Sequence, residues 1–271
     1  MKKNIYLIAA ALLLISTLGF AQKKEKTYEK VFYKEAKIET ADYTMVISQG
    51  VSTDAYTKFR VKITNKTASY LIYKSSESKV MVNGTASNIN EKQMTIDPYD
   101  SEGKTIDVKG KDFNKVLSYS FVAGGIYKVT PPNTSIPAED FKLPPAKNAI
   151  SAGPFFITQE KLSKETDKTT VKFSCVYNGD KMGIICPQKT NMRMPDEKDY
   201  ATVKKEKPIL MTRGQNDSFT LQWDRMQGGK VTDMQKVDMM VKWNDTFSEA
   251  TPETLKAETA TLEMDEAKTN K

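Results

Sequence analysis

Short runs in which apolar and polar residues alternate recur along most of this chain. Successive side chains of a strand point to opposite faces of a sheet, so each run predicts a strand with one buried face. The runs are bounded by Gly, Asn, Asp or Ser, and no convincing helical period interrupts them before the C-terminal segment. We therefore predict an all-β protein. The alternating positions are Phe59/Val61/Ile63, Ile106/Val108, Leu117/Tyr119/Phe121, Val171/Phe173/Cys175/Tyr177, Phe219/Leu221/Trp223 and Val237/Met239/Val241/Trp243.

The order of these runs repeats at a spacing of about 110 to 115 residues, which indicates an internal duplication. The alternative is coincidence, because all antiparallel sandwiches share a rhythm of strand, turn and strand. In order, residues 43–49 resemble 154–159, residues 57–73 resemble 169–186, residues 94–108 resemble 209–223, and residues 117–121 correspond to 239–243 at a slightly larger spacing.

The number and spacing of the strands are typical of two tandem antiparallel β-sandwiches of immunoglobulin-like type. We expect the first domain at residues 22–140 and the second at 141–250. Six of the eleven prolines lie in residues 130–154. Proline fixes φ and cannot donate to a sheet, so we predict a semi-rigid linker that begins near residue 130 and packs partly through Ile136, Phe141 and Leu143. A proline-rich edge that wraps one sandwich is the alternative.

The last segment, residues 251–271, is acidic and rich in Ala, Glu and Thr, with few apolar residues. This composition is typical of a frayed helix or a disordered tail. We expect a solvated tail rather than a docking segment.

The first 21 residues have the pattern of a secretory signal peptide. Lys2 and Lys3 precede an apolar run over residues 5–20, and small residues precede a cleavage site before Gln22. An uncleaved anchor is the alternative, although the run is shorter than the ~20 residues that a spanning helix needs. No cysteine follows the run, so we expect no lipid anchor. The sequence predicts a periplasmic or secreted protein with no transmembrane span after cleavage.

The composition excludes several kinds of chemistry. The chain has no histidine, which removes the commonest general base and metal ligand. Cleavage would leave 250 residues with a net charge of about +5, because Lys2 and Lys3 would be removed from a chain of net charge +7. This weak bias, together with export, argues against nucleic acid as a partner. We expect no catalytic residues, no cofactor and no metal.

Cys175 and Cys186 are the only cysteines, and they flank a strong turn signal at residues 178–181. If the flanking runs pair symmetrically about Asp180 and Lys181, the two cysteines lie opposite each other. An exported protein can form such a bond, so we predict a structural disulfide. Two separate buried thiols are the alternative.

Other residues carry weaker signals. Asp97, Asp100, Glu102 and Asp107 could bind calcium, but their spacing misses known loops and they also suit an ordinary hairpin turn, which we prefer. Residues 76–79 (SESK) formally match a serine-acylase motif whose companion motifs are absent, so we interpret them as a loop. Trp223 and Trp243 suit a sugar-stacking platform, but alternating aromatic residues are more often core.

These observations favour a non-enzymatic protein that binds another envelope or surface protein as a scaffold, assembly or adhesion component. Strand addition at exposed sheet edges is the expected mode of contact. A glycan-binding module is the alternative, and a hydrolase that uses two carboxylates is a more remote one.

Overall fold

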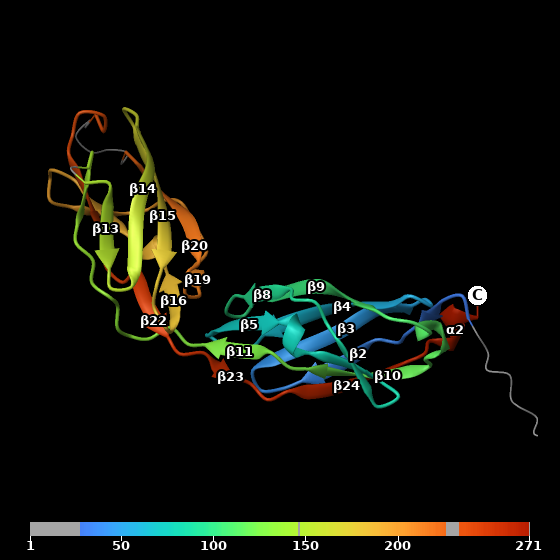
Figure 1. Cartoon of the computed structure of the whole chain (residues 1–271). Helices are drawn as coiled ribbons and strands as arrows, with labels where there is room; N and C mark the ends of the chain where they lie inside the picture. The colour runs from blue at the N-terminus through green and yellow to red at the C-terminus, as the bar shows by residue number, and fades with distance from the viewer. Residues whose placement is uncertain (1–27, 146, 226–232, 271) are drawn as a thin grey trace, which may run out of the picture.

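The computed structural model describes residues 28–145, 147–225 and 233–270. Within these ranges the regular elements are strands, apart from four helical turns of three or four residues, which confirms the all-β prediction. The sheets form two lobes (Figure 1). The expected signal peptide lies outside the described residues.

The first lobe combines elements from both ends of the described chain. Its elements are β1 (Val31–Phe32), β2 (Ala36–Glu39), β3 (Tyr43–Ser52), β4 (Tyr56–Asn65), β5 (Tyr70–Lys74), η1 (Ser75–Glu77), β6 (Lys79–Val82), β7 (Thr85–Asn88), β8 (Gln93–Ile96), β9 (Ser101–Lys109), η2 (Phe113–Lys115), β10 (Ser118–Ala123), β11 (Ile126–Val129), β23 (Glu253–Thr254), β24 (Glu258–Glu263) and α2 (Glu266–Thr269).

The second lobe lies between these two parts of the sequence. Its elements are β12 (Phe141–Leu143), β13 (Ala149–Ala152), β14 (Phe155–Lys164), β15 (Lys168–Tyr177), β16 (Met182–Ile185), η3 (Pro187–Lys189), β17 (Asn191–Arg193), β18 (Asp199–Ala201), β19 (Ile209–Met211), β20 (Asn216–Asp224), β21 (Met239–Lys242) and β22 (Phe247–Ala250).

Each lobe has three antiparallel sheets, and the strand orders of the two lobes correspond. The first lobe has β1–β3–β4–β9 with β2 also on β3, β24–β10–β6–β7, and β23–β11–β5–β8. The second has β13–β14–β15–β20, β12–β21–β17–β18, and β22–β16–β19. Both the β3–β4 pair and the β14–β15 pair contain a register shift, at Ser48/Val51 and Gln159/Lys161 respectively.

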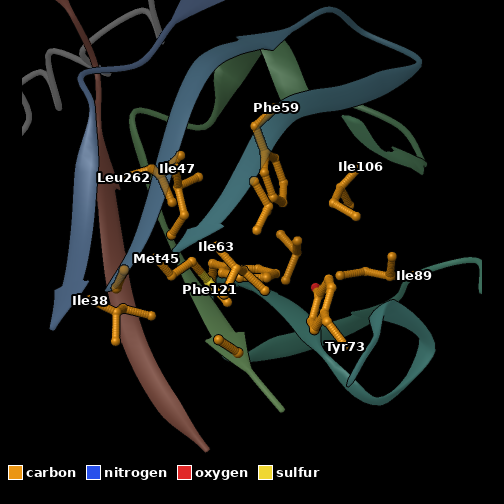
Figure 2. Packing of buried hydrophobic residues seen from close by; sticks show 14 of the residues in the cluster. Ile38, Met45, Ile47, Phe59, Ile63, Tyr73, Ile89, Ile106, Phe121 and Leu262 are labelled. Atoms are coloured by element: carbon orange, nitrogen blue, oxygen red, sulfur yellow. The ribbon is translucent and has the colours of Figure 1, made fainter. Parts of the chain in front are cut away.

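The predicted alternation produces the two cores. In β4 the side chains of Phe59, Val61 and Ile63 are fully buried, while the polar residues between them face outward. Burial of a side chain of this size contributes about 1.5–3 kcal/mol, so each of these three residues stabilises the first lobe. Figure 2 shows how Phe59 and Ile63 converge with other buried residues of the first lobe on one cluster.

The expected solvated tail at 251–271 is wrong for its described part. Strand β24 pairs along its whole length with β10, and Leu262 lies in the core of the first lobe beside Ile47 (Figure 2). The apolar alternation that would predict this strand is weak, because β24 lies at the edge of its sheet and buries only Ala260 and Leu262. Its other positions are polar, as one solvated face of an antiparallel sheet requires.

The predicted disulfide between Cys175 and Cys186 is also wrong, because both thiols are free. The strands that carry the expected hairpin, β15 and β16, lie in different sheets. Cys175 pairs instead with Ile157 and Asp217 on its two neighbouring strands. The turn signal therefore marks a crossing from one sheet to another.

A third apolar cluster joins the two lobes. Strands β5 and β16 are buried on both faces, because one face packs on the core of its own lobe and the other faces the opposite lobe. The cluster consists of Tyr70, Ile72 and Val129 from the first lobe and Met182, Ile184 and Ala250 from the second. At its edge Lys207 forms ion pairs with Asp97 at 2.7 Å and Asp100 at 3.6 Å.

Candidate protein-binding surface

The outward face of the sheet β13–β14–β15–β20 has no charged side chain over two neighbouring rows of paired residues. Along β14 and β15 these outward positions alternate with residues of the core of the second lobe. We call the two rows the uncharged face. They are Ser151–Phe156–Val176–Asn216 and Ala149–Thr158–Ser174–Ser218.

Phe156 is the large apolar side chain of this face, and it is 48% exposed. Its neighbours Phe155 and Ile157 are fully buried, so the alternation of β14 forces the ring between them toward solvent. A partner that covers this ring removes apolar area from water without having to desolvate a charge. The ring is therefore suited to be the anchor of a protein contact.

Ion pairs border the uncharged face at both ends. Glu160 and Lys172 form one pair at 2.6 Å, and Asp180 and Arg213 form another at 2.6 Å. An uncharged centre with a polar rim is the usual composition of a protein-binding patch.

The corresponding rows of the first lobe are different. On the sheet β2–β3–β4–β9, Lys37, Glu39 and Lys62 occupy outward positions. Glu39 accepts hydrogen bonds from Lys37 and Lys66, and these interactions lower its pKa to about 2. The uncharged face is thus a property of the second lobe and not of this type of sheet.

The outer edges of two strands are already occupied. The main-chain N–H of Val203 donates to the carbonyl of Gln222 in β20 at 2.8 Å, and Glu206 accepts from the N–H of Thr220. In the first lobe the Lys92 ammonium donates to the carbonyl of Thr105 in β9 at 2.7 Å. Because these groups have partners, strand addition at β20 or β9 would have to displace them. The face of the sheet is the better candidate.

The two described ends of the chain meet on the first lobe, at its end away from the interlobe cluster. The N–H of Asp265 donates to the carbonyl of Phe32 at 2.7 Å, and Thr269 accepts from the N–H of Phe32 at 3.0 Å. In Figure 1 this junction lies at one end of the molecule, and the sheet with β13, β14 and β15 belongs to the lobe at the other end. An attachment through either terminus would leave the uncharged face accessible.

The two tryptophans do not form a sugar platform. Trp223 is 1% exposed and Trp243 is 2% exposed, and both belong to the core of the second lobe. Trp243 makes edge-on contact with Phe173 and Phe219. The core interpretation of these residues is therefore confirmed.

The carboxylates considered for calcium do not converge. Asp97 and Asp100 pair with Lys207, whereas Glu102 and Asp107 lie on β9 opposite Ile63 and Lys58. Among the described residues, no group of three or more Cys, Asp or Glu side chains is placed to hold a metal.

The SESK segment does not place a serine beside its lysine. Ser76 donates to the carboxylate of Glu91, and Ser78 lies buried, donating to the carbonyl of Gly124 at 3.0 Å. Lys79 begins β6 and is exposed. Residues 75–77 form the turn η1, in agreement with the interpretation as a loop.

The Cys175 side chain is buried and the Cys186 side chain is partly buried. Burial raises the pKa of Cys175 to about 12, and burial also raises the pKa of Cys186, with a smaller opposing effect of Lys189. A raised thiol pKa disfavours the nucleophilic thiolate.

No helix in the described ranges is long and apolar enough to cross a membrane. No protein-family model and no curated protein matches the sequence. Among solved structures, a crystal structure of red sea bream transglutaminase is similar over 82% of this chain and 31% of that chain, with 8% identity and a TM-score of 0.19. A likeness at this TM-score carries no argument about fold or activity.

Proposed function

We propose that this chain is an exported, non-enzymatic protein-binding component of the cell envelope that contacts its partner through the uncharged face. The observation that carries the proposal is the contrast between the lobes. The same two rows are free of charge around an exposed Phe156 in the second lobe and carry Lys37, Glu39 and Lys62 in the first.

We also propose that the two lobes are immunoglobulin-like sandwiches that arose by duplication. From β3 and β14 to β6 and β17, elements at the same place in each lobe begin 112 residues apart, as Tyr43 and Phe155 do in β3 and β14, or Ser75 and Pro187 in η1 and η3. The spacing then rises to 121 residues at β10 and β21, which begin at Ser118 and Met239. A spacing that changes only between elements, together with the same strand order, supports a common origin. After duplication one copy is free to acquire a binding face while the other keeps a solvated one.

The absence of histidine from the sequence supports a binding role over a hydrolytic one. Among the described residues, the carboxyl groups whose pKa values are shifted are Glu39, Asp196, Asp199, Asp238 and Asp265, and all five pKa values are lowered. A general acid of the kind that a glycosidase needs has a raised pKa.

The test is affinity purification from the envelope of the source cell with the protein lacking residues 1–21. Three forms are compared: the parent, Phe156→Lys and Thr44→Lys. Thr44 occupies the position of Phe156 in the first lobe and is paired with Glu39, so its substitution adds the same charge to the other face. We expect a protein partner that the parent and Thr44→Lys retain and that Phe156→Lys loses by at least tenfold in affinity.

Two results would overturn this proposal. One is equal retention of the partner by Phe156→Lys and the parent, which would exclude the uncharged face. The other is binding of the parent to a glycan array with no protein retained, which would favour the glycan-binding alternative. N-terminal sequencing of the exported protein tests cleavage before Gln22, and an intact Met1 would contradict it.

A further inference from the structure

Two segments that lie 119 residues apart fill the same place in opposite lobes. The first, residues 134–143, follows β11 of the first lobe and ends in β12 of the second lobe. The second, residues 253–262, follows the last strand of the second lobe and enters β23 and β24 of the first lobe. We call the place that each segment occupies the strand slot of that lobe.

In the second lobe, the slot is formed by β21 and the start of β22. Phe141 and Leu143 pair with Val241 and Met239, and both are buried in the core. Earlier in the segment, the N–H of Ile136 donates to the carbonyl of Phe247 at 2.7 Å.

In the first lobe, the slot is formed by the equivalent strands β10 and β11. Ala260 and Leu262 pair with Phe121 and Tyr119 and are buried. The N–H of Leu255 donates to the carbonyl of Ile126 at 2.9 Å, as that of Ile136 does to Phe247. The two segments therefore make the same main-chain contact and bury residues at the same two positions.

The segments are also alike in sequence. Residues 135–143 read SIPAEDFKL and residues 254–262 read TLKAETATL, so Ala-Glu and the final Leu coincide while Ser/Thr and Ile/Leu replace each other. Two of these positions contact the slot in both lobes: the Ile or Leu whose N–H donates to the first residue of the facing strand, and the final Leu, which enters the core. Both slots therefore hold an extended segment of similar sequence.

The exchange is reciprocal, because the segment after each lobe completes the other lobe. Two copies of one folding unit that swapped their last strands would have this arrangement. The two occupants differ in one respect. Where the second lobe buries the Phe141 ring, the first buries only the methyl group of Ala260, so this position contributes less apolar area to the binding of β24 than to that of β12.

We propose that the strand slot of the first lobe is a strand-exchange site whose second occupant is the segment 253–264 of another copy of this chain. The segment makes the same contacts with β10 and β11 whether it comes from its own chain or from a second copy. The ratio of slots filled by a second chain to slots filled by their own chain then depends on the protein concentration. It is compared with the effective concentration of the tethered strand, which is in the mM range for short connections. This inference concerns the slot alone and does not depend on the uncharged face.

The experiment uses full-length chains that carry Cys186→Ser, with the fully buried Cys175 retained. Ser120 and Thr261 are paired across β10 and β24 on the outward side. A chain with both Ser120→Cys and Thr261→Cys should form an internal disulfide.

The mixing experiment uses chains with one substitution each, which are unfolded, mixed, refolded at high concentration and oxidised. We expect a disulfide-linked dimer of the two variants. Ser120→Cys mixed with Thr254→Cys is the control, because Thr254 lies opposite Tyr127 in another sheet.

Two results would overturn the proposal. If the double variant forms its internal bond while the mixture yields no linked dimer above the control, the slot does not accept a second copy. If the double variant forms no bond, the register on which the proposal depends is wrong.

Peptides test the recognition pattern separately. A peptide of residues 251–264 with Cys at position 261, and one of residues 132–145 with Cys at the equivalent position 142, should both link to the Ser120→Cys chain during refolding. Scrambled versions should not. Equal linkage of the scrambled peptides would contradict recognition of this pattern.

Discussion

The main-chain N–H of Leu255 donates to the carbonyl oxygen of Ile126 across 2.9 Å, although the whole second lobe lies between these residues in the sequence. This bond marks the return of the chain to the first lobe. It is followed by β24, which supplies Ala260 and Leu262 to a core whose other buried residues all precede residue 127. The stability of the first lobe must then depend on residues near the C-terminal end of the described chain.

We predict that Leu262→Ala lowers the free energy of unfolding by about 2–5 kcal/mol, because it removes a fully buried side chain and leaves a cavity. The neighbouring exposed residue provides the control, and Thr261→Ala should change this free energy by less than about 0.5 kcal/mol. Denaturant unfolding followed by circular dichroism measures both. Equal stability of the two variants would contradict the assignment of β24 to the core.

The free thiols give a second prediction. Reductant should leave the midpoint of denaturant unfolding unchanged, because Cys175 and Cys186 are not joined. A thiol reagent should react slowly with Cys175 in the folded protein, since this side chain is fully buried, and should detect two thiols after unfolding. Detection of no thiol after unfolding without reductant would restore the disulfide that the sequence suggested.

The positions of the strands were predictable from the sequence, but the pairing of the strands within the sheets was not. Alternation at Phe59, Val61 and Ile63 requires only that one face of a strand be buried, and this holds whichever strand lies beside it. The position of Cys186 relative to Cys175 depends instead on whether the chain turns back or crosses to another sheet at residues 178–181. Turn residues are compatible with both a hairpin and a crossing to another sheet. The spacing of the two cysteines alone therefore could not show whether they lie opposite each other.

One residue of the uncharged face, Phe156, was predictable from the sequence. Residues 155–157 read FFI, and a strand that buries Phe155 and Ile157 must expose Phe156. What the sequence could not show is that Ser151, Thr158 and Ser174 lie beside it, because these positions are brought together only by the register of three strands. The return of β24 was hidden for another reason: an edge strand that buries two side chains has too few apolar residues to be recognised by alternation.

The contact between the lobes leads to a third prediction. Ile184→Asp places an unpaired carboxylate in the apolar interlobe cluster, which disfavours the closed arrangement by roughly 3 kcal/mol or more. We expect a larger radius of gyration in small-angle X-ray scattering and faster proteolysis between residues 130 and 135. Lys207→Ala should leave both measurements unchanged, because its ion pairs with Asp97 and Asp100 are exposed at the lysine. An unchanged radius for Ile184→Asp would show that the cluster does not hold the lobes together.

A fourth prediction concerns alkaline pH and the buried hydroxyl of Tyr43. Burial is the main cause that raises the pKa of Tyr43 from 10.0 to about 12, and the charges of Glu258 and Asp42 add to it. An unfolded tyrosine releases its proton near pH 10, so between pH 10 and 12 the unfolded chain binds fewer protons than the folded one. The stabilisation is therefore complete below pH 10 and is lost as the pH rises toward 12.

Tyr43→Phe removes this titration, and it costs little at neutral pH because the buried hydroxyl oxygen has no hydrogen-bond partner among the described residues. We expect unfolding free energies close to those of the parent at pH 7 and a shallower decline between pH 10 and 12. Ile47→Val serves as the control, since it alters the same core without a titratable group and should lower the curve in parallel at every pH. Identical slopes for Tyr43→Phe and the parent above pH 10 would show that Tyr43 ionises in the folded protein as readily as in the unfolded one.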